Sequence, residues 1–281
     1  MFDLPSPSQM KRAFLTVVLL LLLIPTIPTN ACSILYYIDT KTGKIYAVNN
    51  EDYWYDVKPY IQIMPRDDEN LARLWYGWDD FAQGGINESG LFFDGATTPE
   101  QSKINGYSSP DGNLGDNILA TCKTVAQALD YLEKNKIALT NGHMLFGDRT
   151  GNAAVVEWIR GEQKVILMND NRLMITNFLL SDTEQGNYPC PRYTAMENDI
   201  SRIRQANDTI GLKTIGNIAA KAVQPKAKNV DGREGGTLYS TFINITDMEF
   251  VLIYKLDNTK ITKLNLLSEF ANIDERKIEL E

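Results

Sequence analysis

Short apolar runs, several of them alternating apolar with polar residues, dominate this chain and predict a protein built mainly of β-strands. Glycine, proline, asparagine or aspartate bounds most of these runs, as is usual for strands. The predicted strands cover residues 33–39, 44–50, 59–64, 90–95, 152–158, 164–168, 173–176, 237–245 and 249–255. Turns at 40–43, 148–151 and 246–248 predict three hairpins, the second of which pairs residues 143–147 with 152–158.

Helices are predicted in the middle of the chain. Between Asn117 and Asn135, apolar residues recur every three or four positions, which is the period of a helix with one buried face. Residues 192–207 and 214–223 predict two further helices. Hairpins at both ends with helices between them favour an α+β fold, in which two sheets pack together and helices cover them.

Four aromatic residues gather between two predicted strands: Trp75, Tyr76, Trp78 and Phe81. We interpret this segment as a loop. Its rings line an acyl pocket or pack on the core, and the pattern fits both.

The first 31 residues have the pattern of a secretory signal peptide. Lys11 and Arg12 precede an apolar run over residues 13–24, which is shorter than the roughly 20 residues that span a bilayer. Small residues at Thr29 and Ala31 then predict cleavage between Ala31 and the following cysteine.

Cleavage at this point leaves a mature chain of residues 32–281, which we expect to form a single domain that is secreted or periplasmic. Cys32 becomes the first residue and is followed at once by an apolar strand. The alternative is a lipoprotein signal, in which Cys32 would be lipidated and the protein would be a membrane-anchored, non-catalytic binding protein. Such signals usually carry leucine where this chain has Thr29.

Composition excludes several classes of function. The net charge is −8, and residues 1–31, with two basic residues and one acidic residue, take it to −9 when removed. Without a basic run, neither nucleic acid nor an anionic membrane surface is an expected partner. A single histidine and no Cys-x-x-Cys spacing argue against a zinc site, and we expect no metal or other cofactor.

The histidine also bears on the chemistry. His143 opens an apolar stretch, so we interpret it as a structural residue at a strand entry, and the base of an acyl transfer must be another group. Among the three cysteines, Cys122 and Cys190 could pair in an oxidising compartment, although nothing in the sequence brings them together.

An N-terminal cysteine carries its own general base. Its α-amine has a pKa near ~8 and its thiol one near ~8.5, so a proton moves easily between them at neutral pH. A carboxylate is then needed to orient the amine. Glu51 and Asp52 lie at the end of the strand paired with that of Cys32, and because they alternate faces only one can point at Cys32. The alternative is a polar strand end that faces water.

Several short motifs occur in a characteristic order along the mature chain: Cys32 with its strand, Asn-Asn-Glu-Asp-Tyr at 49–53, Gly-Ile-Asn-Glu-Ser-Gly-Leu at 85–91, Ile-Thr-Asn at 175–177, Pro-Arg-Tyr at 191–193 and Thr-Leu-Tyr-Ser-Thr at 237–241. In this order and spacing they resemble the cysteine N-terminal nucleophile (Ntn) hydrolases of the penicillin V acylase and choloylglycine (bile salt) hydrolase family, which cleave linear amide C–N bonds. The resemblance implies a four-layer αββα sandwich.

The resemblance also implies roles for single residues. Cys32 would be the nucleophile with its amine as base, and Asp52 would orient that amine. Asn177 would donate to the oxyanion, Asn87 would be a second polar group near it, and Arg192 would favour the thiolate.

Two alternatives accompany this carry-over. Asn87 also lies in an Asn-x-Ser triplet and fits a turn residue, and Arg192 fits a surface residue at a helix start. Asn49 departs from the family, whose relatives have an arginine at this position.

We therefore predict a secreted amidohydrolase that forms an acyl-thioester on Cys32, with a small-molecule N-acyl amide as its substrate. An acyltransferase on the same scaffold is the alternative within the family. The acyl group, the leaving amine and the oligomeric state, including a homo-oligomer, stay open.

Overall fold

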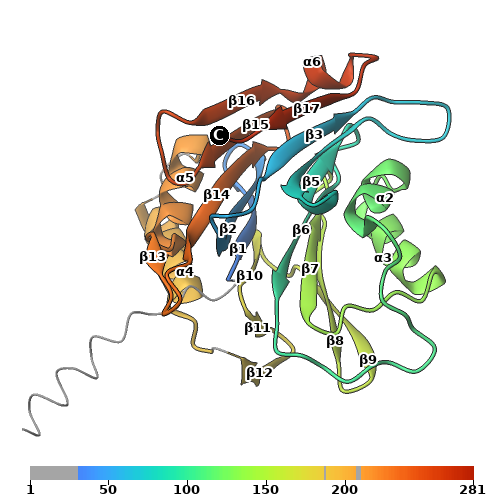
Figure 1. Ribbon diagram of the computed structural model, residues 1–281, viewed down its shortest axis with the longest axis vertical. Helices are drawn as coiled ribbons and strands as arrows, with labels where there is room; N and C mark the ends of the chain where they lie inside the picture. Colours follow the sequence, from blue (N-terminus) through green and yellow to red (C-terminus); the bar gives the residue numbers. More distant parts are fainter. Residues whose placement is uncertain (1–30, 187, 207–209) are drawn as a thin grey trace, which may run out of the picture.

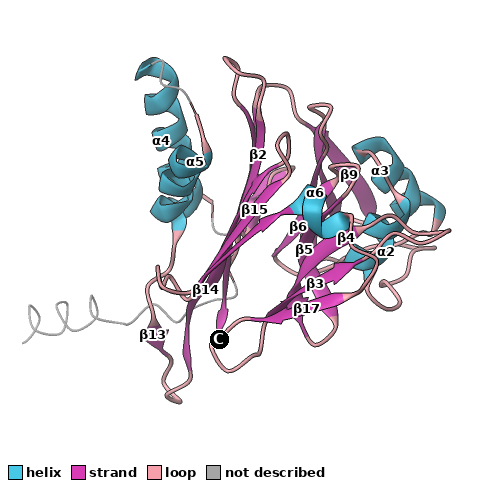
Figure 2. Ribbon diagram, turned by 90° about the horizontal axis from the view of Figure 1, so that it is seen from above, coloured by secondary structure: helices cyan, strands magenta, loops and turns pink. Residues whose placement is uncertain are grey.

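Two antiparallel β-sheets pack face to face and helices cover the outer face of each, as Figures 1 and 2 show. The computed structural model describes residues 31–186, 188–206 and 210–281. The predicted signal peptide, apart from its last residue, lies outside the described residues. The α+β, four-layer αββα arrangement predicted from the sequence is confirmed.

The first sheet contains the strand that begins next to Cys32. Its order is β10-β1-β2-β14-β15-β16, with β13 added beside β14. The strands are β1 (Ser33–Ile38), β2 (Ile45–Trp54), β10 (Arg172–Ile175), β13 (Ala227–Lys228), β14 (Glu234–Asn244), β15 (Glu249–Tyr254) and β16 (Ile261–Asn265). The turns after Ile38 and Asn244 close the predicted first and third hairpins.

The second sheet has the order β17-β3-β4-β5-β6-β7-β8-β9, so all but its first strand follow the order of the chain. Its strands are β3 (Tyr60–Met64), β4 (Arg73–Trp78), β5 (Phe81–Asn87), β6 (Phe92–Thr97), β7 (Gly142–Gly147), β8 (Ala153–Ile159), β9 (Glu162–Leu167) and β17 (Arg276–Glu279). A separate two-stranded ribbon joins β11 (Phe178–Leu179) and β12 (Asp182–Gly186).

Each outer layer consists of two helices, and Figure 2 shows the two pairs on opposite sides of the sandwich. The second sheet is covered by α2 (Leu114–Thr121) and α3 (Val125–Lys134), and the first sheet by α4 (Pro191–Ala206) and α5 (Leu212–Ala219) with the 3₁₀ turn Ala220–Ala222. A short helix, α6 (Leu266–Phe270), follows β16 at the edge. Three apolar cores result, one between the sheets and one under each helical layer.

The predicted helix over residues 117–135 is wrong in one respect, because the structure divides it in two. Cys122 is extended at the end of α2, and Thr124 caps α3 by accepting a hydrogen bond from the Gln127 backbone N–H. The period of apolar residues continues through the break because both helices pack on the same sheet face.

The aromatic segment is also different from its prediction, since it forms a hairpin and not a loop. Asp79 and Asp80 make a two-residue turn with positive φ values of 53° and 56°, between Trp78 and Phe81. Asp-Asp is a weaker turn signal than Asn-Gly or Asp-Gly, which explains why the pattern missed it.

Candidate active site

The thiol of Cys32 faces a carboxylate on the neighbouring strand. Because Ser33 pairs with Asn50, Cys32 lies across from Glu51 in the antiparallel ladder, and their side chains share one face. The Cys32 Sγ donates to Glu51 Oε1 at 3.3 Å. Cys32 is 5% exposed and Glu51 4%. The strand register therefore places Glu51, and not Asp52, beside the sulfur.

Asp52 occupies the opposite face of β2 and is fully buried. Its Oδ1 accepts from Thr237 Oγ1 at 2.5 Å, and its Oδ2 accepts from Arg192 Nη1 at 3.1 Å. Its backbone oxygen accepts from the N–H of Ala31 at 3.3 Å, so Asp52 lies beside the point where the predicted cleavage would free an amine.

Arg192, the second residue of α4, links the elements around Cys32. Its Nη1 donates to the backbone oxygen of Cys32 at 3.0 Å and to Ser33 Oγ at 3.1 Å, in addition to Asp52. Its Nη2 donates to Asn177 Oδ1 at 2.7 Å. The guanidinium thus holds β1, β2 and the segment after β10 together, and it contacts the backbone of Cys32.

Asn177 follows β10 and lies at the edge of this arrangement. Its Nδ2 donates to the backbone oxygen of Thr97 at 2.9 Å and to Thr97 Oγ1 at 3.1 Å. Thr97, at the end of β6, lines the same cavity as Cys32. A substrate oxygen would therefore compete with Thr97 for the amide protons of Asn177. No motif in the sequence pointed to Thr97.

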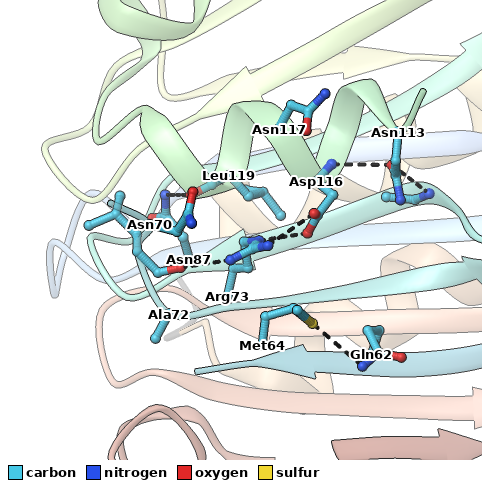
Figure 3. Close-up of polar contacts among 12 residues, drawn as sticks. Gln62, Met64, Asn70, Ala72, Arg73, Asn87, Asn113, Asp116, Asn117 and Leu119 are labelled. Carbon is cyan, nitrogen blue, oxygen red and sulfur yellow. Dashed lines mark hydrogen bonds and ion pairs between the residues drawn. The ribbon is translucent and has the colours of Figure 1, made fainter. Parts of the chain in front are cut away.

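Asn87 takes a structural place instead of the predicted one beside the oxyanion. Its Nδ2 donates to the backbone oxygens of Leu119 and Cys122, and its Oδ1 accepts from the backbone N–H groups of Ser89 and Leu91. Figure 3 shows Asn87 beneath α2, beside Leu119. Because these bonds close the turn after β5 and fasten the end of α2, Asn87 is the turn residue that the sequence left as an alternative.

His143 is fully buried and both ring nitrogens have partners. Its Nδ1 lies 3.0 Å from Glu157 Oε1, and its Nε2 lies 2.8 Å from the backbone oxygen of Thr176. Burial alone would raise the pKa of Glu157, but hydrogen bonds from His143 and Ser181 outweigh it and lower that pKa. Glu157 also accepts from the backbone N–H groups of Leu180 and Ser181. The pair therefore holds the segment that contains Asn177 from both sides.

Replacing His143 with glutamine should lower the free energy of unfolding by about 1–3 kcal/mol, because the buried Glu157 carboxylate and the Thr176 carbonyl lose their hydrogen bonds to the imidazole. Turnover should stay within about tenfold, since His143 is not the base. Urea unfolding and kcat below the melting transition measure the two effects. A loss of several orders of magnitude in kcat with a stable fold would contradict this assignment.

Several carboxyl groups lie close together in the dry interior around Cys32. Burial raises the pKa of Glu51 to about 7, against hydrogen bonds from Cys32 and Asn49 that lower it. Burial likewise raises the pKa of Asp52 to about 7, although Thr237 and Arg192 lower it. Burial, and then the charges of Glu51, Asp52 and Asp94, raise the pKa of the Cys32 thiol. These groups therefore cannot all be ionised at the same time without a large cost in free energy.

Stability should therefore fall as pH rises through this range. A carboxyl whose pKa is raised by folding stabilises the native state while protonated, and this contribution disappears between its unfolded pKa of about 4 and its folded pKa of about 7. Glu51→Gln should remove a part of the decline on the order of 3 kcal/mol. Urea unfolding of both proteins at pH 4.5 and pH 7.5 (about the two ends of the window) measures this decline in stability. An equal decline in the two proteins would show that folding does not raise the pKa of Glu51.

A cavity of 290 Å³ opens onto the thiol. Its wall includes Cys32 and Glu51 together with four aromatic residues, Tyr53, Trp78, Phe81 and Phe93. The rings of Tyr53 and Trp78 are 4.5 Å apart between centroids. Of the aromatic segment, Trp78 and Phe81 thus line the cavity, whereas Trp75 packs under α2 and Tyr76 lies between the sheets.

The described residues contain no metal site, no disulfide and no membrane-spanning helix. In the part of the chain that the structure describes, no group of three or more His, Cys, Asp or Glu side chains could hold a metal ion. Cys32, Cys122 and Cys190 are each free and buried. None of the helices within the described ranges is both long and apolar enough to cross a bilayer.

Comparison with known proteins places these features in a family. The sequence model of the acyl-coenzyme A:6-aminopenicillanic acid acyl-transferase family matches residues 39–249. None of the curated proteins matches the chain.

Solved structures share the fold. A variant of the conjugated bile acid hydrolase from Clostridium perfringens superimposes with a TM-score of 0.70 and 17% identity, covering 88% of this chain and 97% of its own. The penicillin V acylase from Agrobacterium tumefaciens does so with a TM-score of 0.66 and 16% identity, covering 88% and 90%. These neighbours are amide hydrolases, the class of enzyme that the sequence predicts.

Proposed function

Because the chain belongs to the acyl-coenzyme A:6-aminopenicillanic acid acyl-transferase family, we propose that it cleaves the C–N bond of a linear amide with Cys32 as its N-terminal nucleophile. The observation that carries the proposal is the position of Cys32, which directly precedes the strand β1 and lines an aromatic cavity with its thiol beside Glu51. The neighbours named as a bile acid hydrolase and a penicillin V acylase support hydrolysis of an N-acyl amide.

Removal of residues 1–31 is the activating step in this proposal. While Ala31 is attached, the nitrogen of Cys32 is an amide that accepts no proton, and burial with nearby carboxylates raises the pKa of the thiol. Cleavage would free an amine beside the backbone of Asp52, where its charge favours the thiolate. The mature protein is then secreted or periplasmic, with no lipid on Cys32.

The reaction follows the usual course of a cysteine N-terminal nucleophile. The thiolate attacks the amide carbonyl, the α-amine exchanges protons with the reacting groups, and the leaving amine departs protonated. Arg192 fixes the backbone of Cys32 and the carboxylate of Asp52, and Asn177 donates to the oxyanion after releasing Thr97. Water then hydrolyses the acyl-thioester.

Acyl transfer is the second candidate, because the family is described by an acyl-transferase. In that case an amine takes the place of water in the second half of the reaction. The site residues have the same roles in both reactions.

The processed protein beginning at Cys32 should release amine from N-acyl amides, and a panel with aromatic, long-chain and steroidal acyl groups identifies the substrate. The same protein with extra residues before Cys32 should be inactive. Added amine acceptors that trap the acyl group in place of water would identify a transferase. Full turnover by the extended protein would contradict the proposal.

A further inference from the structure

A buried polar cluster lies directly behind the Cys32 thiol and has no role in the scheme above. It consists of Glu51 and Asn49 from β2, Tyr76 from β4 and Asp94 from β6, all less than 5% exposed. The Asn49 Nδ2 donates to Glu51 Oε2 at 3.3 Å, and the Tyr76 hydroxyl donates to Asp94 Oδ2 at 2.7 Å. The cluster draws its residues from both sheets, and Glu51 is its member in the cavity wall.

The close packing at Gly84 shows that this cluster has a defined shape. A Cβ added to Gly84 would lie 2.2 Å from Asp94 Oδ2 and 2.5 Å from the Tyr76 hydroxyl. Any residue other than glycine would therefore displace one of these groups. The absence of a side chain at Gly84 therefore leaves room for the Asp94 carboxyl group between the sheets.

We propose that Glu51 is a catalytic residue that takes the proton of the Cys32 thiol, so that the pair shares one negative charge. The inference rests on the proposed function and deepens it. Glu51 Oε1 contacts the reacting sulfur at 3.3 Å, whereas the other nearby carboxylate, Asp52, lies on the opposite face of the strand. A thiolate and a carboxylate in contact within a dry interior cannot both carry a charge without a large cost. The proton therefore passes from one to the other.

Asn49 fits both protonation states of Glu51. It donates Nδ2 to the carboxylate, while its Oδ1 is buried without a hydrogen-bond partner among the described residues. A half-turn of the amide would present Oδ1 to a protonated Glu51, which then donates. An arginine here, as in the relatives that the sequence resembles, would stabilise a negative charge and could not accept a proton.

The titratable groups that face Glu51 come from several elements besides its own strand. Cys32 directly precedes β1, Tyr76 lies on β4, Asp94 on β6 and Tyr239 on β14, and Asp52 follows on β2. Burial places the pKa of Glu51 at about 7, where a base that works at neutral pH is most effective. The guanidinium of Arg192 binds Asp52, on the other face of the strand from Glu51.

The protons then balance over the whole cycle. The Sγ–H bond breaks and an Oε1–H bond forms, and the thiolate attacks the carbonyl carbon while the α-amine is still an ammonium. When the C–N bond breaks, the ammonium gives its proton to the leaving amine. The free amine next takes a proton from the attacking water. As the C–S bond breaks, Glu51 returns its proton to the thiolate, the ammonium and carboxylate are restored, and the carboxylic acid product leaves.

The test is the reactivity of the thiol, which needs no substrate. The protein beginning at Cys32 carries Cys122→Ala and Cys190→Ala, so that one thiol is left, and reacts with iodoacetamide at about pH 7, where most of the amine still carries its proton and about half of Glu51 is ionised. Glu51→Gln should lower the rate of alkylation by roughly tenfold or more, because the thiol loses its proton acceptor. It should also lower kcat/KM for an N-acyl amide by roughly 10²–10⁴.

Asp94→Asn is the matched control. It removes a buried carboxylate from the same cluster without contact to the sulfur, so alkylation should stay the same or become faster. If Glu51→Gln also reacted as fast as the parent or faster, Glu51 would be only a negative charge and the proposal would be overturned.

Two further arms keep the result interpretable. Should Glu51→Gln unfold, as circular dichroism would show, Glu51→Asp carries the test, since a carboxyl withdrawn by one methylene must slow alkylation. An unchanged rate for Glu51→Asp would then overturn the proposal. If the parent alkylates normally but hydrolyses no amide, the proposed function fails, whereas the assignment of Glu51 is still decided by the alkylation rates.

Discussion

Replacing Cys32 with serine should lower kcat for amide hydrolysis by roughly 10³-fold or more while the protein stays folded. The hydroxyl ionises far less readily than the thiol, and Glu51 at about pKa 7 cannot take its proton. The substitution replaces one buried sulfur atom by a slightly smaller oxygen atom, so the free energy of unfolding should change little. Steady-state kinetics and urea unfolding measure both quantities.

Cys122→Ala and Cys190→Ala are the controls for this substitution. Both residues are buried and free, and neither lines the cavity of Cys32. Their removal costs packing and leaves turnover near that of the parent. Loss of activity in these two variants together with an active Cys32→Ser protein would move the nucleophile elsewhere.

Replacing Arg192 with leucine should be the most damaging change outside the nucleophile. It removes the partner of the buried Asp52 carboxylate and the contacts to Cys32, Ser33 and Asn177. We expect the free energy of unfolding to fall by about 3–5 kcal/mol. We also expect kcat to fall by roughly 10²-fold or more, because the backbone of Cys32 and the amide of Asn177 lose their support.

Arg204→Leu on the same helix is the matched control, because among the described residues this arginine pairs with Asp170 near the surface. Its loss should change stability by less than about 1 kcal/mol and leave kcat unchanged. Arg192→Lys should lie between, since one ammonium cannot reach the four acceptors that the guanidinium fork reaches. Equal stability of Arg192→Leu and Arg204→Leu would contradict the central place of Arg192.

Much of the fold could be predicted because local pattern and tertiary structure agree. The hairpin around residues 40–43 combines alternating strands with a glycine at φ 71°, and β1 and β2 form as expected. The helix over 117–135 failed because capping by Thr124 is a short polar signal inside a continuous apolar period. The β4–β5 hairpin failed because aromatic residues on both faces of β4 hide its alternation.

The site was predictable where it depended on strand geometry. The pairing of β1 with β2 brings residues 51 and 52 to the start of β1, and Arg192 arrives because α4 begins there. Which of the two carboxylates faces the thiol depends on a shift of one residue in register, which the sequence left open. Asn87 shows the limit of short motifs, because the same triplet that could bind an oxyanion also closes a turn.

The central claim, that Cys32 is an N-terminal nucleophile, is tested most directly by trapping the acyl-enzyme. The processed protein is mixed with a substrate from the N-acyl amide panel, quenched in acid and analysed by mass spectrometry of the intact protein and its peptides. The account predicts an increase equal to the acyl group on the peptide that begins at Cys32, with a free α-amine, and its removal by hydroxylamine. An acyl group on another residue, or turnover with Cys32 blocked or lipidated at its amine, would contradict it.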